Sequence, residues 1–326
     1  MNKELEGLKK KLIWWVALLG FCLSFSVNNL SAQSPGEKIE LIHSDSLVYL
    51  SLDSGKEIRY LGNVFFRKGR EEVRCDRATH YPDKELTILQ GNVDYQDSSR
   101  SLKADYFEYY SNPERQLARG NVELFVDEKR ILANEVSYIV DEKFAQALGD
   151  VRFFDLKDDF HLFCQKLSYD TGSKRVFAEI KPRLVKLDSL RNPGITIEAE
   201  SLTYDDSSRT AVAKDSVTIT HEAMVAKSML AEYFRDGNRI VLTDAPKVVH
   251  QKNSEMTAER IELFFENDSL RQVYMRGKGV MLSHFLVAGE PEFDRLSGAE
   301  FWIDIKDDTV RNILVKGQAT STYHLI

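Results

Sequence analysis

The sequence predicts an all-β protein built from stacked repeats, and two observations predict it. A Gly-Asn/Asp-Val tripeptide recurs at a fixed spacing of 29 residues, at Gly62-Asn63-Val64, Gly91-Asn92-Val93, Gly120-Asn121-Val122 and Gly149-Asp150-Val151. Around each copy, apolar and polar residues alternate with the two-residue period of a β-strand. A repeat of this length indicates that each unit buries its apolar face only against its neighbours.

The first 32 residues are expected to be a signal peptide. The basic stretch Lys9-Lys10-Lys11 precedes an apolar run over residues 12–27, and Leu30-Ser31-Ala32 supplies a small-residue cleavage site. The run is somewhat shorter than the ~20 residues that a membrane-spanning helix needs. The alternative is an uncleaved anchor in the inner membrane with its positive end in the cytoplasm. In either case the rest of the chain is expected to be exported.

Residues 33–326 are expected to form a single elongated array of about nine repeat units. A hydrophobic content of 43% is enough for a sizeable core, and the chain has only 7 prolines and no Ser/Gly-rich linker. The net charge is −7, although the signal segment itself is basic. An acidic surface is a poor partner for nucleic acid, so this class of partner is excluded.

One repeat unit, from Gly91 onwards, illustrates the expected elements. Gly91-Asn92 is a turn signal, after which Val93 begins a first strand. The second strand carries a small residue, an apolar residue at +3 and often tyrosine at +5, as at Ala104, Phe107 and Tyr109. The odd spacing requires one extra residue, so a β-bulge or sheet corner is predicted at the acidic residue that follows the small one.

The repeat continues in the second half of the chain without its glycine. There the first-strand slot is occupied by Lys181-Pro182-Arg183-Leu184, Lys214-Asp215-Ser216-Val217, Ala245-Pro246-Lys247-Val248 and Gly277-Lys278-Gly279-Val280. The second strand near Ala226 is ambiguous, because Ser228, Ala231 and Tyr233 fit the signature as well.

The alternation assigns inward faces and therefore candidate binding residues. The predicted inward set is Val64, Phe66, Val93, Tyr95, Val122, Leu124, Val151, Phe153, Val217 and Ile219. Val126, Val280 and Leu282 share the same parity, whereas Asp94, Glu123, Arg152 and Thr218 should face water. For each inward residue the alternative is a place in a solid core. The tyrosines at +5 could line a trough mouth or be packed core rings.

The two cysteines outside the signal segment are expected to be free thiols. Cys75 and Cys164 both occupy the small-residue slot, three units apart. Stacked strands lie ~4.8 Å apart, so three steps exceed the ~7 Å between Cα atoms that a disulfide allows.

A constellation of catalytic or cofactor-binding residues is not found in the sequence. The seven histidines are scattered without metal-ligand spacing, and no nucleophile elbow, P-loop or dinucleotide fingerprint occurs. The acidic residues Asp105, Glu200 and Glu259 recur in one slot of the repeat, which favours a structural role. We therefore expect no enzyme activity, no cofactor and no metal site.

The Gly-Asn-Val turn, the Ala-Asp/Glu-x-x-x-Tyr strand and the export signal together resemble the OstA-like family of lipopolysaccharide-transport proteins. Its members include LptA, LptC and the N-terminal domain of LptD. The resemblance is strongest over residues 41–170. It implies a β-jellyroll of V-shaped cross-section, located in the periplasm, with an apolar trough for the acyl chains of lipid A. It also implies a role in outer-membrane assembly.

Physical arguments support such a conduit. A dozen-carbon chain forfeits about 10 kcal/mol when it is exposed to water, so its transfer needs a continuous apolar lining. The open ends of a strand stack invite end-to-end strand pairing with similar jellyroll proteins. The alternatives are a structural or adhesive β-solenoid with a filled core, and a carbohydrate-binding β-fold, which would require exposed aromatic stripes on outward positions.

Overall fold

The computed structural model describes residues 39–324, except residues 54, 99, 127, 158, 171, 189, 206, 252, 267–268, 288 and 307–308 and the side chain of residue 235. The predicted signal segment, residues 1–32, lies outside the described residues. The expectation of an all-β fold is confirmed: the described chain consists of strands, connecting turns and two short 3₁₀ turns, η2 (Pro82–Lys84) and η3 (Arg235–Gly237). No helix in this part of the chain is long and apolar enough to span a bilayer.

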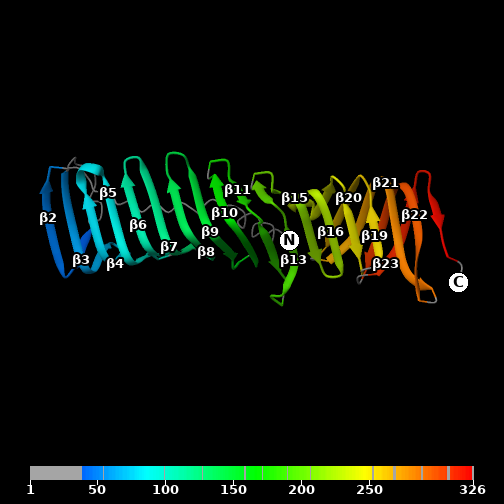
Figure 1. Ribbon diagram of the computed structural model, residues 1–326, viewed down its shortest axis with the longest axis horizontal. Helices are drawn as coiled ribbons and strands as arrows, with labels where there is room; N and C mark the ends of the chain where they lie inside the picture. Colours follow the sequence, from blue (N-terminus) through cyan, green and yellow to red (C-terminus); the bar gives the residue numbers. More distant parts are fainter. Residues whose placement is uncertain are drawn as a thin grey trace, which may run out of the picture. The chain divides into compact units, whose positions relative to one another are not determined.

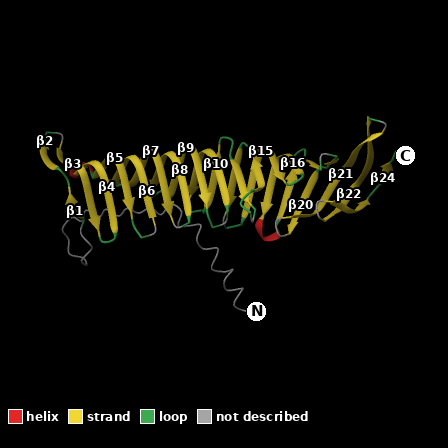
Figure 2. Cartoon of the chain, turned by 90° about the horizontal axis from the view of Figure 1, so that it is seen from below, coloured by secondary structure: helices red, strands yellow, loops and turns green. Residues whose placement is uncertain are grey.

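The chain divides into two compact units. Unit 1 comprises Met1–Asp158 and Phe163–Val176, and unit 2 comprises Asp159–Leu162 and Phe177–Ile326. Figure 1 shows each as a series of antiparallel hairpins side by side, and Figure 2 gives a second view of the same strands. The prediction of one array over residues 33–326 stays a prediction.

The strands of unit 1 are long, with 11 to 14 residues each, apart from the first two, which have 4 and 7. They are β1 (Glu40–His43), β2 (Ser46–Leu52), β3 (Gly55–Lys68), β4 (Glu71–Tyr81), β5 (Leu86–Gln96), β6 (Arg100–Ser111), β7 (Glu114–Val126), β8 (Lys129–Ile139) and β9 (Phe144–Asp155). The boundary with unit 2 runs through β10 (Phe160–Asp170) and β11 (Arg175–Glu179). From β3 to β9 each strand pairs antiparallel with the next.

The remaining strands belong to unit 2, and several of them are short. They are β12 (Arg183–Leu187), β13 (Pro193–Glu198), β14 (Ser201–Asp205), β15 (Thr210–His221), β16 (Met224–Phe234), β17 (Arg239–Thr243), β18 (Lys247–His250), β19 (Ser254–Thr257), β20 (Arg260–Glu266), β21 (Ser269–Val287), β22 (Glu290–Lys306), β23 (Thr309–Lys316) and β24 (Thr320–Thr322).

The Gly-Asn pair forms a corner inside a strand. The prediction that it forms a turn between two strands is wrong. Gly91 and Asn92 lie within β5, with φ of 71° and 45°. In the first copy, Leu61 pairs with Arg77 and Val64 with Cys75, so two residues of β3 oppose one residue of β4. The predicted bulge is therefore present, but its extra residue lies on the Gly-Asn strand, opposite the acidic residue.

The corner divides each strand into two arms. In a strand that carries a Gly-Asn pair, we call the part before the pair arm A and the part after it arm B. In the strands between them, arm A contains the +3 and +5 residues and arm B ends at the small residue. In β5, for example, arm A is residues 86–90 and arm B is residues 93–96, while in β4 they are residues 77–81 and 71–75. In every antiparallel pair an arm-A segment lies beside an arm-A segment and an arm-B segment beside an arm-B segment. The arm-A segments therefore form one part of the bent sheet, and the arm-B segments form the other.

An aspartate in or next to the neighbouring strand holds three of the unit 1 corners in place, and Asn134 takes its position at the Gly149 corner. The amide Nδ2 of Asn92 donates to Asp76 at 2.9 Å, and Nδ2 of Asn121 donates to Asp105 at 2.8 Å. The glycine is required because a Cβ atom at Gly120 would lie 2.4 Å from a carboxylate oxygen of Asp105. The structural role predicted for Asp105 is thus seen directly.

The same backbone corner persists in unit 2 where glycine is lost. Positive φ recurs in consecutive pairs, which are Ile180-Lys181, Asp215-Ser216, Asp244-Ala245, Gly277-Lys278 and Gly317-Gln318. With the four Gly-Asn/Asp pairs of unit 1 they make nine described corners. Pro182 and Pro246 follow two of these pairs, and there the strand is interrupted between β11 and β12 and between β17 and β18. A proline cannot donate to the ladder, which accounts for the breaks.

The register of unit 2 settles one ambiguity and corrects one prediction. Val217 pairs with Ser228 and Ala213 with Ala231, so the signature begins at Ser228. In β21 the corner is Gly277-Lys278, so Gly279 and Met281 are buried, and the inward assignment of Val280 and Leu282 is wrong by one residue. A Cβ atom at Gly279 would lie 2.7 Å from the ring of Phe301, which fills the space of the missing side chain.

Candidate functional site

The candidate site is the interior between the two arms, and arm B of unit 1 supplies most of the predicted residues. Val64, Val93, Val122 and Val151 each follow a corner and are only 1–2% exposed. The first three pair with the small residues of the neighbouring strands. Small side chains at this position let the two arms approach closely behind the corner.

A second row lies two residues further along arm B. Tyr95, Leu124 and Phe153 are buried and are linked through the cross-strand pairs Tyr95–Leu102–Leu124 and Leu124–Ile131–Phe153. Side chains that are directly opposite in a ladder share one face. The sequence-derived faces of these strands are therefore those of the structure.

Phe66 belongs to the same row but is only half-buried. It pairs with Leu41 of β1, which is itself exposed, and its ring makes an edge contact with Tyr60 at a centroid distance of 5.1 Å. The neighbouring Phe65 points the opposite way and is buried by Arg74, whose guanidinium carbon lies 3.7 Å from the ring centroid. A cation over the ring thus covers an outward aromatic residue that the alternation assigns to water.

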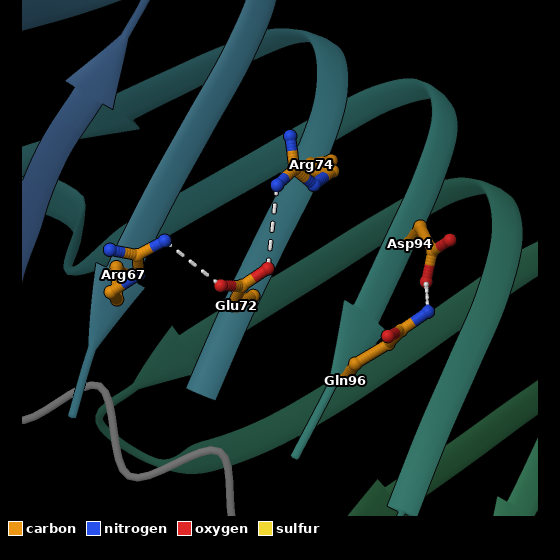
Figure 3. Close-up of polar contacts among 5 residues, drawn as sticks. All are labelled: Arg67, Glu72, Arg74, Asp94 and Gln96. Carbon is orange, nitrogen blue, oxygen red and sulfur yellow. Dashed lines mark hydrogen bonds and ion pairs between the residues drawn. The ribbon is translucent and has the colours of Figure 1, made fainter. Parts of the chain in front are cut away.

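The outward face of arm B carries charge, as the alternation predicts. Figure 3 shows Glu72 accepting hydrogen bonds from Arg67 at 3.1 Å and Arg74 at 3.4 Å. On the next strand Gln96 donates to Asp94 at 3.3 Å. The two ion pairs of Glu72 are exposed, so each contributes little stability. The charged side chains nevertheless keep this face of the sheet soluble.

In unit 2 the predicted residues Val217 and Ile219 lie in a densely packed core. They belong to one cluster with side chains of both arms, including Leu242, Met275 and Phe301, which are fully buried. Side chains with no accessible surface leave no water-sized space beside them. The interior of unit 2 around this cluster is therefore filled by its own residues.

Arm A contributes two further interior rows, whose residues are not in the predicted inward set. The row nearer the corner is apolar and buried and runs through Ala78, Leu89, Phe107, Ala118, Val136 and Ala147. The row two residues further out, which we call the rim row, runs through His80, Thr87, Tyr109, Gln116, Tyr138 and Ala145. The +5 signature identifies Tyr109 and Tyr138. Gln116 lies two residues from the inward Ala118 in the same strand, so the two-residue alternation would have identified it as inward.

The rim row is polar, and part of it is internally satisfied. The Nδ1 atom of His80 lies 3.0 Å from the hydroxyl of Thr87. Burial lowers the pKa of His80, because the charged imidazolium loses its hydration there. We therefore expect this histidine to be neutral at pH 7.

The hairpin ends of arm B carry buried ion pairs. Arg100 and Asp97 lie 2.6 Å apart, and the hydroxyl of Tyr95 donates to the same carboxylate at 3.1 Å. Burial, together with the nearby charges of Glu71 and Asp97, raises the pKa of Tyr95 above its ordinary value. Two strands on, Lys129 approaches the buried Asp155 at 3.9 Å. The interior thus changes from apolar near the corner to polar near the hairpin ends.

The two cysteines are free and buried, as predicted. Burial is the main cause that raises the pKa of Cys75 to about 12 and that of Cys164 to about 11. A thiol with such a pKa is not a nucleophile at neutral pH. Among the described residues, no group of three or more His, Cys, Asp or Glu is arranged to hold a metal ion.

Comparison with solved structures gives a match of low sequence identity. One solved structure that the chain is similar to is LptH from Pseudomonas aeruginosa, described as the LptA homologous periplasmic component of the lipopolysaccharide transport device. The identity is 15%, the match covers 51% of this chain and 92% of LptH, and the TM-score is 0.20. No curated protein sequence matches.

A family model described as LptA/(LptD N-terminal domain) LPS transport protein matches residues 73–269, more than half of the chain. The matched region begins in β4, at the arm-B row of unit 1, and ends in β21 of unit 2. The chain belongs to the LptA/LptD N-terminal-domain family of lipopolysaccharide transport proteins.

Proposed function

We propose that this protein binds lipopolysaccharide and carries it through the periplasm, with the acyl chains of lipid A between the two arms. The lipid would pass along the apolar rows toward the outer membrane, and no chemical step is required. The observation that carries the proposal is the apolar lining of unit 1, where arm-A and arm-B rows of buried side chains run from strand to strand.

Lipid entry would require the arms to separate. The rows of unit 1 are buried, so an acyl chain must replace contacts that the side chains now make with each other. Such an exchange is feasible because one apolar contact substitutes for another, and each methylene taken from water gains ~0.8 kcal/mol. The seam between the hairpin ends of the two arms is the natural entrance, since no strand pairing across it is described.

Photo-cross-linking tests this proposal with matched neighbours in one strand. A benzoylphenylalanine residue at Phe153 or Tyr95 should cross-link to lipid A, because both side chains face the interior. The same group at Arg152 or Asp94, which face outward, should not. Equal yields at both parities, or none at the inward positions of a folded protein, would contradict the proposal.

We also propose that the chain associates end to end with other jellyroll proteins. At the first edge of unit 1, the inner-face residues Leu47 and Tyr49 of β2 are 54% and 56% exposed. At the last strands of unit 2, the inner-face residue Ile313 of β23 is 36% exposed. Exposed apolar side chains on an edge strand suit strand addition.

A structural solenoid is the second candidate, and the filled core of unit 2 favours it. Leu242, Val248 and Met256 are fully buried, which leaves no space for a ligand beside these three side chains. In this alternative the cross-linking experiment would yield no lipid adduct at any position, although the protein would remain folded.

A further inference from the structure

The rim row of unit 1 differs in chemistry from the equivalent row of unit 2. In unit 1 four adjacent strands place Thr87, Tyr109, Gln116 and Tyr138 side by side on the inner face. In unit 2 the same row starts with Tyr204, Ala211 and Tyr233, but over the next four strands it is aliphatic and reads Ile240, Leu263, Val273 and Ile303. An aliphatic row is sufficient for a stable interior, so the polar row of unit 1 needs another explanation.

Gln116 is the most unusual member of the rim row. Its side chain is 3% exposed, and neither its Nε2 nor its Oε1 atom has a hydrogen-bond partner among the described residues. An amide buried in this way loses its hydration without compensation, which is costly. Native proteins rarely leave both ends of a buried amide unsatisfied, so a partner from outside the chain is indicated.

The surroundings of Gln116 define what that partner must offer. Tyr109 and Tyr138 lie directly across from it on either side, and Ala118 of the apolar row lies two residues deeper in the same strand. Two residues of a strand span about 6.8 Å. A ligand here would place hydrocarbon on the deep row and a group that both donates and accepts hydrogen bonds at the level of Gln116.

We propose that Gln116 is a hydrogen-bonding subsite for the amide linkage of a fatty acyl chain bound inside unit 1. The Nε2 atom would donate to the linkage carbonyl, Oε1 would accept from an N–H or hydroxyl group, and the alkyl chain would lie along Ala118 and its row. The proposal rests on the lipid-binding function proposed above and names the chemical group that is recognised.

The test compares two soluble amphiphiles that have the same chain length and different linkages. N-octanoyl glucosamine carries an amide, whereas octyl glucoside carries a glycosidic acetal linkage, which has neither a carbonyl nor an N–H group. Both are used below their micelle-forming concentrations. The full mature chain should bind the amide about fivefold to thirtyfold more tightly. Gln116→Leu should abolish this preference and raise the melting temperature, because it removes an unsatisfied buried amide. Gln90→Leu, at an exposed position of arm A, is the control and should keep the preference.

The outcomes separate this subsite from the general function. If Gln116→Leu keeps the preference for the amide, or if the intact protein has none, the inference is overturned and Gln116 is a water-binding or structural residue only. If the intact protein prefers the amide and Gln116→Leu does not, but lipid A does not bind, the subsite is supported and the proposed lipopolysaccharide function is contradicted. If lipid A binds equally to the intact protein and to Gln116→Leu, the proposed function is supported and the subsite is contradicted.

Discussion

The corner is set by individual residues whose backbone lies in the left-handed region. A pair of consecutive positive φ values turns the strand, and glycine tolerates the first of them without steric cost. The acidic residue of the neighbouring strand then packs over the glycine and accepts the asparagine amide. Ile180, a β-branched residue at φ 66°, shows that the fold imposes this conformation even where the residue opposes it.

Gly120→Ala should be more destabilising than Gly289→Ala. Both glycines have positive φ, at 74° and 91°, so both variants carry the penalty of about 1–2 kcal/mol for an L-residue there. Only at Gly120 would the new Cβ meet a neighbour, Asp105, whereas nothing lies within 4 Å of Gly289. Urea unfolding should therefore give a larger loss for Gly120→Ala.

The contact itself can be isolated by a double-mutant cycle. Adding Asp105→Ala should recover part of the loss caused by Gly120→Ala. If the two glycine variants are equally destabilised, or if Asp105→Ala gives no recovery, the close approach at the corner is not the cause.

Cys75 should make the stability of the protein fall at high pH. Burial raises its pKa in the folded state to about 12 from the ordinary thiol value of 9.0, so the folded protein resists loss of the thiol proton. The stabilisation by the neutral thiol is fully present below pH 9 and is lost as the pH rises toward 12, by up to about 1.4 kcal/mol per pH unit. The free energy of unfolding should thus fall more steeply above pH 9 than that of Cys75→Ala.

Tyrosines and lysines also titrate in this range, so the comparison with Cys75→Ala is the necessary control. Parallel stability profiles for the two proteins between pH 8 and 11 would show that the thiol is not buried in its neutral form.

At the scale of elements, alternation was sufficient to predict strands and faces but not where the chain bends. Val93 and Tyr95 are inward as expected because a two-residue period leaves no other choice within a strand. The pattern could not distinguish a turn between strands from a corner inside one, since Gly-Asn serves both. The same limit explains Val280, because two glycines in Gly277-Lys278-Gly279 allow the corner to be placed at either position.

The candidate binding residues predicted from the sequence all lie on arm B, whereas inward residues of arm A entered only through the +3/+5 signature, as at Phe107 and Tyr109, and Gln116 was missed. The apolar signature marks Leu124 and Phe153, but a glutamine is ordinarily assigned to solvent. Phe65 is missed for the converse reason, because only the coordinates reveal that Arg74 covers it. Burial of a polar residue, or of an outward aromatic one, depends on neighbours from other strands.

The exposed edge of β2 should mediate self-association or partner binding. Leu47→Asp combined with Tyr49→Asp should weaken assembly about tenfold or more, because it puts charge on the inner face of an open edge. Val48→Asp changes the opposite face of the same strand and serves as the control. Sedimentation velocity over a concentration series measures the effect, and identical behaviour of the two variants would argue against docking through this face.

At the scale of the whole molecule, a repeat stack distributes stability along the chain. Each hairpin contacts mainly its sequence neighbours, as the pairings from β3 to β9 illustrate. Stability in such an array is approximately the sum of local terms and nearest-neighbour terms. Because the chain divides into two compact units, local unfolding caused by a substitution in one unit is expected to stop at the boundary between them.

Val122→Asp should therefore melt unit 1 and leave the core of unit 2 protected. Val122 is 1% exposed, and a buried carboxylate without a partner costs several kcal/mol. Hydrogen exchange followed by mass spectrometry should show loss of protection in β5 to β9, while β20 to β22, which contain the fully buried Ile261, Met275 and Phe301, retain theirs. Glu123→Gln, at the adjacent outward position, should leave both regions unchanged. Equal loss of protection in the two units would mean that the chain unfolds as one cooperative body, because nearest-neighbour coupling alone cannot carry a lesion in β7 as far as β22.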